Sequence, residues 1–493
     1  MSEARVVVVT RDRTESLRRT LSSILEHARQ FGRGVTISVF DDSRSAAGRR
    51  ACVKEVCDVK ELFHCDIVYS DRGDRVHYAR ALSDRCGVDF ETALFALLGP
   101  RDCDVSIGAT RNTALLASSG KKILFVDDDV LLHPVAVAQK PGVRCTSEAR
   151  PVLTHKCGSY GAALDRCGEV TSDILDLYSR YLGYTVVDCL RTLGESLKTE
   201  AHLPGTAMSP HSYVVMSQFG IVGDLGQASP SWVLTSSGDQ RKVLLSSADR
   251  YEMARRSRFG IRVADVTTFT DSPFCMTYAT GVDGRMVLPP FIPLGRNSDG
   301  AFGVLVRALY QHSCTVHLAV GVAHNKSSSV YDPGQIWADA GRLRFADLLS
   351  LLIGHARFGD QPSSVRDGYA HLGASLMECA ARPDLNELLR FVTRSYLAAK
   401  LKTLEGLLQA HAYSPPYWAE DAQRATRHLR AQIGSEDPSL VSDLNVSSAD
   451  DRLQLIRGIV GRFGTLLKSW PSMQEAAQAM PRPCMPLRVL GNN

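Results

Sequence analysis

The feature that most constrains the fold is a series of short, strongly apolar runs that end in polar or acidic residues. Residues 4–10 read ARVVVVT, residues 35–42 read VTISVFDD, and residues 122–129 read KILFVDDD. Continuous runs rich in β-branched residues are typical of strands that are covered on both faces of a parallel sheet. We therefore expect a buried sheet whose strands bring carboxylates to one of its edges.

Helical patterns separate these runs. Apolar residues recur at helical spacing after the first run, with Thr14 able to cap the helix and Gly32 just past its end. A second helix is predicted from Arg111 to Ser118, ending at Gly120. Strands that alternate with helices predict an α/β domain with a largely parallel sheet, in which ligands bind at the carboxyl ends of the strands.

The chain divides into three parts by composition. With 493 residues, of which 44% are apolar, it is long enough for two or three domains or subdomains. Residues 1–135 carry the alternating pattern, residues 136–330 are richer in Gly, Pro, Ser and Thr, and residues 331–493 contain long amphipathic helices. The apolar faces of those helices must be buried, either in a homodimer, against a protein acceptor or over the sheet.

Composition also excludes several classes of protein. A net charge of +4 is too diffuse on this chain to indicate nucleic-acid binding, and the thirteen cysteines form neither a CxxC pair nor a zinc spacing. Reduced thiols are the simpler interpretation. No secretory leader and no apolar stretch of about 18 residues is found, so we expect a cytoplasmic protein without a membrane span.

Four motifs, in this order along the chain, resemble family 2-like glycosyltransferases of the GT-A fold, of the bacterial type. They are VVVVTRDRTESLRRTLSSIL, VFDDS, GATRNTALLASSGKKILFVDDD and GRNSDGAFG, within residues 1–330. The resemblance implies that residues 1–135 bind a nucleotide-diphosphate sugar, a UDP-sugar by family habit, and that residues 136–330 bind the acceptor. A peptide or protein, a saccharide and a small molecule all stay open as acceptors. The C-terminal helices lie outside the resemblance.

The three adjacent aspartates match the family's DxD motif. Three neighbouring anions resist desolvation, so their position after a strand suits a cation or solvent. The resemblance implies that Asp129 contacts Mn²⁺ or Mg²⁺, that Asp127 contacts the ribose or the metal, and that Asp128 lies at the nucleotide. A solvated acidic turn is the alternative.

Residues at the ends of two other predicted strands resemble the family's nucleotide-binding residues. Asp41 is the preferred partner of the base and Asp42 the reserve, while Thr10 and Arg11 resemble residues that lie against the base. An Asx-type turn would explain the two aspartates without a ligand.

The TRN motif places Arg111 and Asn112 at a predicted helix start, where both could face a phosphate or a base edge. The resemblance assigns them to the nucleotide. A surface arginine at a helix start is the alternative.

Residues from the second half complete the predicted site. Asp299 matches the aspartate of the family's ED motif and is the candidate base that deprotonates the acceptor hydroxyl, although Ser298 stands where the family often has glutamate. An Asn-Ser-Asp-Gly turn would explain the same residues. His324, rather than His317, resembles a further metal ligand found in some GT-A enzymes, while a structural histidine is the alternative.

Three residues are candidates for the acceptor side: Asp224, Asp283 and Trp232. Aromatic and carboxylate groups can hold sugars or peptides. The surrounding glycine-rich turns would explain them without any ligand.

A metal-dependent, inverting glycosyltransferase is the leading hypothesis. A nucleotidyltransferase would also hold a cation on an α/β sheet, but the first strand lacks the glycine-rich phosphate loop of that class. A catalytically degenerate GT-A scaffold, with the C-terminal helices as an interaction module, is the non-enzymatic alternative.

Overall fold

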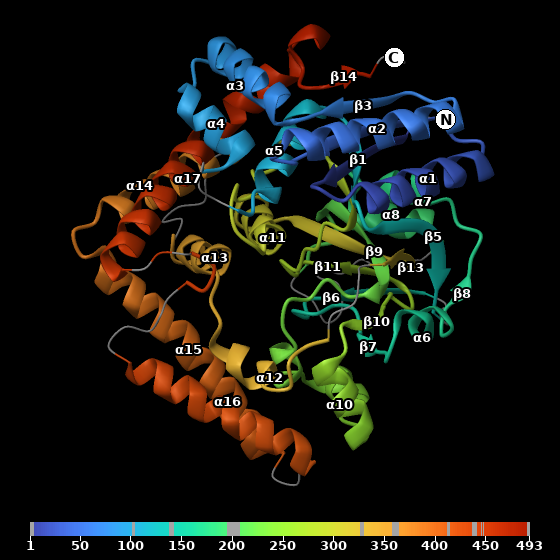
Figure 1. The fold of residues 1–493 in the computed structure, drawn as a ribbon. Coiled ribbons are helices and arrows are strands. Elements are labelled where there is room, and N and C mark those ends of the chain that lie inside the picture. The colour runs from blue at the N-terminus through green and yellow to red at the C-terminus, as the bar shows by residue number, and fades with distance from the viewer. Residues whose placement is uncertain are drawn as a thin grey trace.

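The structure is a computed structural model that describes residues 4–100, 104–137, 142–194, 208–325, 330–356, 364–411, 415–435, 441–444, 446 and 448–490. Its strands are β1 (Ala4–Thr10), β2 (Val35–Asp41), β3 (Ile67–Ser70), β4 (Lys122–Asp127), β5 (Val130–Ala136), β6 (Val143–Thr146), β7 (His155–Lys156), β8 (Gly168–Glu169), β9 (Tyr213–Asp224), β10 (Phe259–Arg262), β11 (Thr267–Thr270), β12 (Ala279–Asp283), β13 (Ser313–His324) and β14 (Arg488–Val489). They form one mixed sheet whose main path runs β14-β3-β2-β1-β4-β12-β9-β13-β11-β6 (Figure 1).

The helices before β13 are α1 (Thr14–Gln30), α2 (Ala46–Phe63), α3 (Arg72–Cys86), α4 (Phe90–Leu98), α5 (Ile107–Ala117), α6 (Tyr160–Leu164), α7 (Ile174–Arg180), α8 (Val186–Thr192), α9 (Gly238–Leu244), α10 (Ala248–Arg256) and α11 (Ser298–Leu309). After β13 come α12 (Gln335–Ala338), α13 (Phe345–His355), α14 (Val365–Ala381), α15 (Leu385–Ala410), α16 (Pro416–Gly434) and α17 (Ala449–Gln478). Short 3₁₀ turns are η1 (Ser231–Val233), η2 (Asp339–Gly341) and η3 (Arg482–Cys484).

The first part of the sheet has the predicted parallel arrangement. Strands β3, β2, β1 and β4 are neighbours, and every pair among them is parallel. Thr10 is opposite Asp41, and Val9 is opposite Asp127, so the three acidic or polar strand ends lie at one edge. The α/β class and the strands expected near residues 4–10, 35–41 and 123–126 are thereby confirmed.

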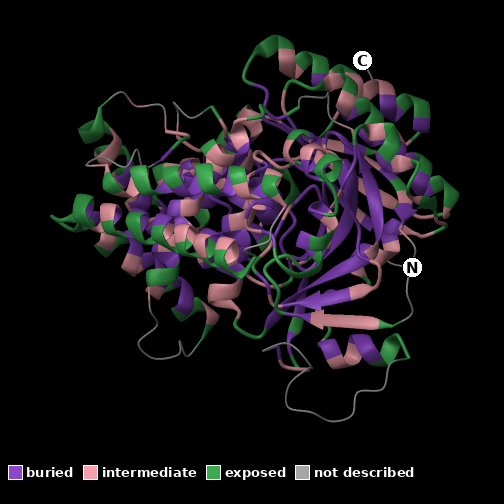
Figure 2. Ribbon diagram, turned by 90° about the horizontal axis from the view of Figure 1, so that it is seen from below, coloured by how far each residue is buried: buried purple, intermediate pink, exposed green. Residues whose placement is uncertain are grey.

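Alternation along β1 explains why helices cover both faces of the sheet. Val6 and Val8 belong to an apolar cluster that contains residues of α1 and α2, whereas Val7 and Val9 belong to another with residues of α3, α4 and α5. A strand with apolar side chains on both faces must be covered on both. Figure 2 shows most of the strands in the colour of buried residues.

Beyond β4 the sheet becomes mixed. Strand β12 is antiparallel to both β4 and β9, and β13 is parallel to β9 but antiparallel to β5 and β11. The largely parallel sheet predicted from the first half therefore holds for β3-β2-β1-β4 and not for this part. At the end of β13, His324 pairs with Val130, the first residue of β5, next to the three aspartates.

The C-terminal helical region predicted from the sequence is present and covers part of the sheet. Helices α14 and α17 belong to the same apolar cluster as Val7 and Val9, and Trp470 of α17 donates a hydrogen bond from Nε1 to the carbonyl of Leu288 at 2.6 Å. The chain then returns to the sheet, where β14 pairs with β3 (Figure 1). For α14 and α17, covering the sheet is the alternative that the structure shows.

Helices α15 and α16 form a separate cluster around the buried Trp418, together with residues of η1, α10 and α12. This cluster places α15 beside the loops of the middle third of the chain. In the described part of the chain, the helices are too short or too polar to cross a bilayer.

Candidate functional site

A cavity of about 370 Å³ lies where β1, β2 and β4 end, and we call it the edge pocket. Its wall contains most of the residues predicted for the site: Thr10, Arg11, Asp42, Arg111, Asp127, Asp128, Asp129, Asp299 and His324. These residues come from six segments of the chain: residues 10–11, 42, 111, 127–129, 299 and 324. Parallel strands bring the first segments together, and the pairing of β13 with β5 adds His324.

Asp128 and Asp129 are buried and are held by groups at the end of β1 and in the loop that follows it. Thr10 donates from Oγ1 to Asp128 at 2.8 Å, and Arg13 donates from Nη1 to Asp128 at 3.2 Å and to Asp129 at 2.9 Å. Burial and the neighbouring Asp129 raise the pKa of Asp128 to about 6. Arg13 therefore occupies the space directly against two of the three aspartates. Thr14, expected to cap α1, is instead its first residue, and Arg13 stands at the N-cap position.

Asp129 also contacts His324, whose Nε2 lies 2.9 Å from Oδ1. The other ring nitrogen, Nδ1, lies against the carbonyl oxygen of Asp224, which can only accept a hydrogen bond. Nδ1 must then carry a proton, so Nε2 faces the carboxylate either protonated or bound to a cation. Burial opposes the charged ring, but the hydrogen bond and charge of Asp129 raise the pKa of His324 above its usual range.

This donor set fits a divalent cation that is shared with a substrate. Among the described residues, no group of three or more His, Cys, Asp or Glu side chains is arranged to hold a metal. Mg²⁺ and similar ions are commonly held by one or two protein carboxylates together with substrate phosphate oxygens. Asp129 and His324 supply two adjacent ligands of suitable type, provided that Arg13 moves aside.

Asp127 points to a different partner. Arg111 donates from Nη2 to Asp127 Oδ1 at 2.8 Å. Burial raises the pKa of Asp127, against the opposite effect of Arg111. Helix α5 begins at Ile107, not at Arg111, because the chain already turns after Ser106. Arg111 therefore enters the pocket from the second turn of the helix, and the helix-start interpretation of Arg111 and Asn112 was wrong.

Asn112 has a structural position outside the edge pocket. Its Nδ2 donates to the carbonyls of Ala96 and Phe291 at 3.0 Å each, and its Oδ1 accepts from the Phe291 amide at 2.7 Å. The side chain thus ties α4 and α5 to the loop before α11. Nothing in these contacts faces a ligand.

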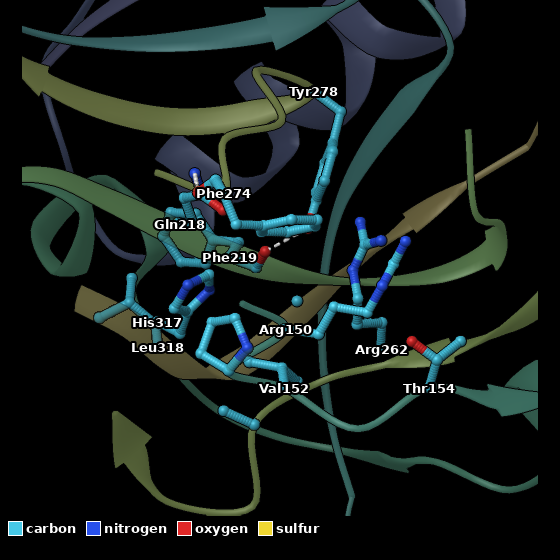
Figure 3. Close-up of a pocket in the computed structure, with 13 residues that line it drawn as sticks. Arg150, Val152, Thr154, Gln218, Phe219, Arg262, Phe274, Tyr278, His317 and Leu318 are labelled. Carbon is cyan, nitrogen blue, oxygen red and sulfur yellow. Dashed lines mark hydrogen bonds between the residues drawn. The ribbon is translucent and has the colours of Figure 1, made fainter. Parts of the chain in front are cut away.

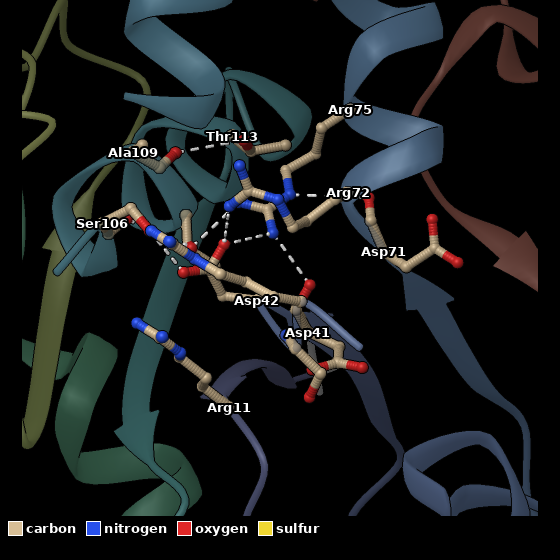
Figure 4. Close-up of polar contacts among 12 residues, drawn as sticks. Arg11, Asp41, Asp42, Asp71, Arg72, Arg75, Ser106, Ala109 and Thr113 are labelled. Atoms are coloured by element: carbon tan, nitrogen blue, oxygen red, sulfur yellow. Dashed lines mark hydrogen bonds and ion pairs between the residues drawn. The ribbon is translucent and has the colours of Figure 1, made fainter. Parts of the chain in front are cut away.

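Of the two aspartates at the end of β2, Asp42 and not the preferred Asp41 reaches the pocket. Asp41 is fully buried, accepts a hydrogen bond from Tyr69 Oη at 2.6 Å and lies outside the pocket wall. Asp42 lines the pocket. Its Oδ1 accepts from Arg72 at 2.7 Å and from Arg75 at 2.8 Å, and Ser106 donates to its Oδ2 (Figure 4). Burial opposes ionisation of Asp42, but Arg75 and Ser106 lower its pKa below the usual range.

Arg11 lines the pocket, and its guanidinium donates to the carbonyl of Asp104. With Arg13 and Arg111 it places three guanidinium groups in the pocket wall beside the three aspartates. Such a mixture of fixed charges suits a ligand that combines a metal ion with phosphate groups.

A second cavity of about 820 Å³ adjoins the first, and we call it the outer pocket. Asp299 lines both cavities, together with Arg296, Asn297, Gly226 and Met276. The far wall of the outer pocket is helix α15, through Tyr396 and Lys400 among others. A C-terminal helix thus completes a cavity that the first 330 residues leave open.

Asp299 stands at the start of α11, where its Oδ1 accepts a hydrogen bond from the Gly300 amide at 3.0 Å. The preceding Asn297 adopts the left-handed conformation, with φ of 68°, and donates from Nδ2 to Asp347 at 2.7 Å. Ser298 is buried, and its Oγ finds no hydrogen-bond partner in the described part of the chain. Asn297 rather than Ser298 therefore fixes the turn that presents Asp299.

The three acceptor-side candidates are dispersed. Trp232 lines the outer pocket, with the Arg150 guanidinium 4.6 Å from its ring centre. Asp224 pairs with Arg258 at 2.9 Å and supports His324 through its carbonyl. Asp283 pairs with Arg285 and stands opposite Lys122 at the start of β4, the end remote from Asp127. Only Trp232 among them faces the outer pocket.

Sequence reasoning missed Arg13, Arg75 and the side chains of α15. Arg13 lies in the first of the four quoted motifs, but no spacing rule connects it to residues 128 and 129. In comparisons with known proteins, no family model and no curated protein matches the chain.

Proposed function

We propose that this protein is a metal-dependent glycosyltransferase that moves a sugar from a nucleotide-diphosphate donor, a UDP-sugar, to an acceptor hydroxyl with inversion. The observation that supports it best is the position of Asp299 on the shared wall of two adjoining pockets. One pocket gathers the carboxylates, histidine and arginines that suit a metal and a diphosphate. The other is large enough for a second substrate.

The edge pocket would hold the donor. Asp129 and His324 would hold Mn²⁺ or Mg²⁺, with Asp127 beside it, and the bound cation would neutralise charge on the diphosphate leaving group. Arg11, Arg13 and Arg111 would bind the phosphate oxygens, since guanidinium groups form strong charge-assisted hydrogen bonds with them. The parallel β3-β2-β1-β4 arrangement, with acidic residues at its carboxyl edge, supports a GT-A-like fold for this half.

Asp299 would act as the general base. A carboxylate between the two substrates can accept the proton of the acceptor hydroxyl while that oxygen attacks the anomeric carbon from the face opposite the diphosphate. This geometry gives inversion. Asn297 and the Gly300 amide would keep the carboxylate oriented toward the pocket boundary.

Isothermal titration calorimetry with UDP, with and without Mn²⁺, tests the donor site. We expect binding that depends on Mn²⁺ and that is lost in Asp129→Asn, which keeps the size of the side chain. Asp283→Asn is the matched control, because it alters a buried, arginine-paired aspartate at the other end of the sheet. If neither UDP nor GDP binds to the folded wild-type protein, the catalytically degenerate scaffold becomes the better interpretation.

A further inference from the structure

A group of basic side chains behind the outer pocket is not used by the proposed transfer reaction. Arg150, Arg262 and His317 line a small recess whose walls also include Phe274 and Tyr278 (Figure 3). The recess borders both larger cavities, because Arg150 and Phe274 also line the outer pocket and Tyr278 also lines the edge pocket.

Arg262 is buried there, and no carboxylate among the described residues forms an ion pair with it. Only 4% of the residue is exposed, and its Nη1 has no hydrogen-bond partner in the described part of the chain. Its Nη2 contacts the sulfur of Met276 at 2.8 Å, and its guanidinium carbon lies 5.2 Å from the ring centre of Phe274. A buried guanidinium normally has a carboxylate or another strong acceptor, since burying an unpaired charge is strongly unfavourable.

The neighbours of Arg262 add positive charge. Figure 3 shows the guanidinium groups of Arg150 and Arg262 side by side. Partial burial and the charge of Arg262 lower the pKa of Arg150 to about 10. The charges of both arginines help to lower the pKa of the nearby Lys156. The carboxylate of Asp224, which is also close to Lys156, is already paired with Arg258. The described residues therefore leave an excess of positive charge around the recess.

His317 provides a second unpaired polar atom. The residue is 5% exposed, and its Nε2 has no hydrogen-bond partner in the parts of the chain that the structure describes. Burial and the two nearby arginines, Arg262 and Arg144, lower the pKa of His317 to about 3, so the ring is neutral and can donate one hydrogen bond. With the ring proton on Nε2, two buried donors line one recess and call for an acceptor.

The size of the recess limits what can enter. Its volume of about 10 Å³ admits roughly one water-sized atom. One oxygen of a planar carboxylate fits this space, with the rest of its molecule in the adjoining outer pocket. A tetrahedral phosphate would need a wider opening.

We propose that the recess binds a carboxylate oxygen of the acceptor, so that the acceptor is a hydroxyl-bearing carboxylic acid. Arg262 and His317 bind the oxygen, and Arg150 contributes charge at the entrance from the outer pocket. That the carboxylate belongs to the acceptor rests on the proposed function, whereas the binding of a carboxylate in the recess does not. The recess would then select acidic acceptors over neutral ones of the same shape.

Glucuronate and glucose are suitable probes because they differ by a carboxylate on the same ring. We expect 50 mM glucuronate to raise the midpoint of thermal unfolding by about 2 °C at constant ionic strength, and glucose to leave it unchanged. Arg262→Met should abolish the glucuronate shift. Arg307→Met is the control, since it removes a partly buried arginine on α11 that does not line the recess.

Arg150→Met tests the proposal independently if Arg262→Met does not fold, because Arg150 stands at the entrance and retains solvent exposure. This variant should weaken the glucuronate shift at least twofold. An equal shift with glucose, a glucuronate shift that survives in the folded variants, or a shift with inorganic phosphate but not with glucuronate would overturn the proposal. Titration of UDP on the same samples separates the two hypotheses, since loss of UDP binding bears on the donor site alone.

Discussion

Nε2 of His324 lies 2.9 Å from Oδ1 of Asp129, although 195 positions separate the two residues in the chain. The contact follows from the pairing of β13 with β5, which sets His324 opposite Val130. A further backbone hydrogen bond, from the Asn325 amide to the Asp129 carbonyl at 3.0 Å, fixes the same position. The histidine is thus held beside the aspartates by the sheet and not by a flexible loop contact.

Replacing this histidine tests its role as a metal ligand. We expect His324→Ala to lower the Mn²⁺-dependent affinity for UDP by about 10- to 100-fold, the range seen when a group that supports a metal site is removed. Calorimetry with UDP and Mn²⁺ measures the change. His355→Ala, at an exposed position of α13, should leave the affinity unchanged. Equal affinity in His324→Ala and the wild type would show that His324 has only a structural role.

Arg13 should compete with the cation. Its guanidinium contacts both Asp128 and Asp129, and its side chain is 42% exposed. Removing it in Arg13→Met should strengthen Mn²⁺ binding in the absence of nucleotide by about threefold, a modest gain because half-exposed ion pairs are worth at most about 1 kcal/mol. Metal titration by calorimetry measures this. Arg18→Met, on the same helix, is the control, and weaker Mn²⁺ binding in Arg13→Met would mean that Arg13 supports the metal site instead.

Asp299 should be needed for turnover and not for donor binding. Removal of a general base usually lowers the rate by about 10²- to 10⁴-fold. We expect Asp299→Asn to lower UDP release from a UDP-sugar by this factor in the presence of a working acceptor, with UDP affinity within about twofold of the wild type. Asp339→Asn, which changes another carboxylate of the outer pocket, should retain most of the activity. A fully active Asp299→Asn would exclude Asp299 as the base.

Much of the edge pocket was predictable because its residues follow strands with a strong local signal. A β-branched run at residues 4–10 and apolar runs before Asp41 and Asp127 have no alternative to a buried sheet, and parallel pairing then places their ends together. The choice between Asp41 and Asp42 was not predictable from alternation alone. It depends on Tyr69 of β3 lying against Asp41 and on Arg75 of α3 reaching Asp42, and these are contacts between separate elements.

Other parts of the site depend on long-range packing that no local pattern encodes. Because the residues before the TRN motif are also helical, α5 starts at Ile107 and Arg111 lies in its second turn. The outer pocket needs α15, whose apolar face predicted burial but not the partner. The antiparallel insertion of β12 beside β4 set Asp283 at the wrong end of the sheet for a site residue.

The buried Lys156 gives a prediction about stability and pH. Burial, together with Arg258, Arg262 and Arg150, lowers the pKa of Lys156 to about 7, against the effect of Asp224. Its Nζ donates to the Ser257 carbonyl at 2.7 Å. In the unfolded chain the lysine keeps its proton up to a pH of about 10. Between these values the unfolded state binds more protons than the folded state, so this residue makes the free energy of unfolding rise with pH.

The expected slope from Lys156 is about 1.4 kcal/mol per pH unit between about pH 7 and pH 10. Lys156→Met removes this contribution. The free energy of unfolding of the wild type should therefore increase relative to that of the variant as the pH rises through this window. Urea unfolding at four pH values measures the difference. The free energy of unfolding of Lys242→Met, a change at an exposed position on α9, should vary with pH as that of the wild type does. A constant difference between Lys156→Met and the wild type would mean that Lys156 stays protonated in the folded protein, with its charge stabilised by the nearby Asp224.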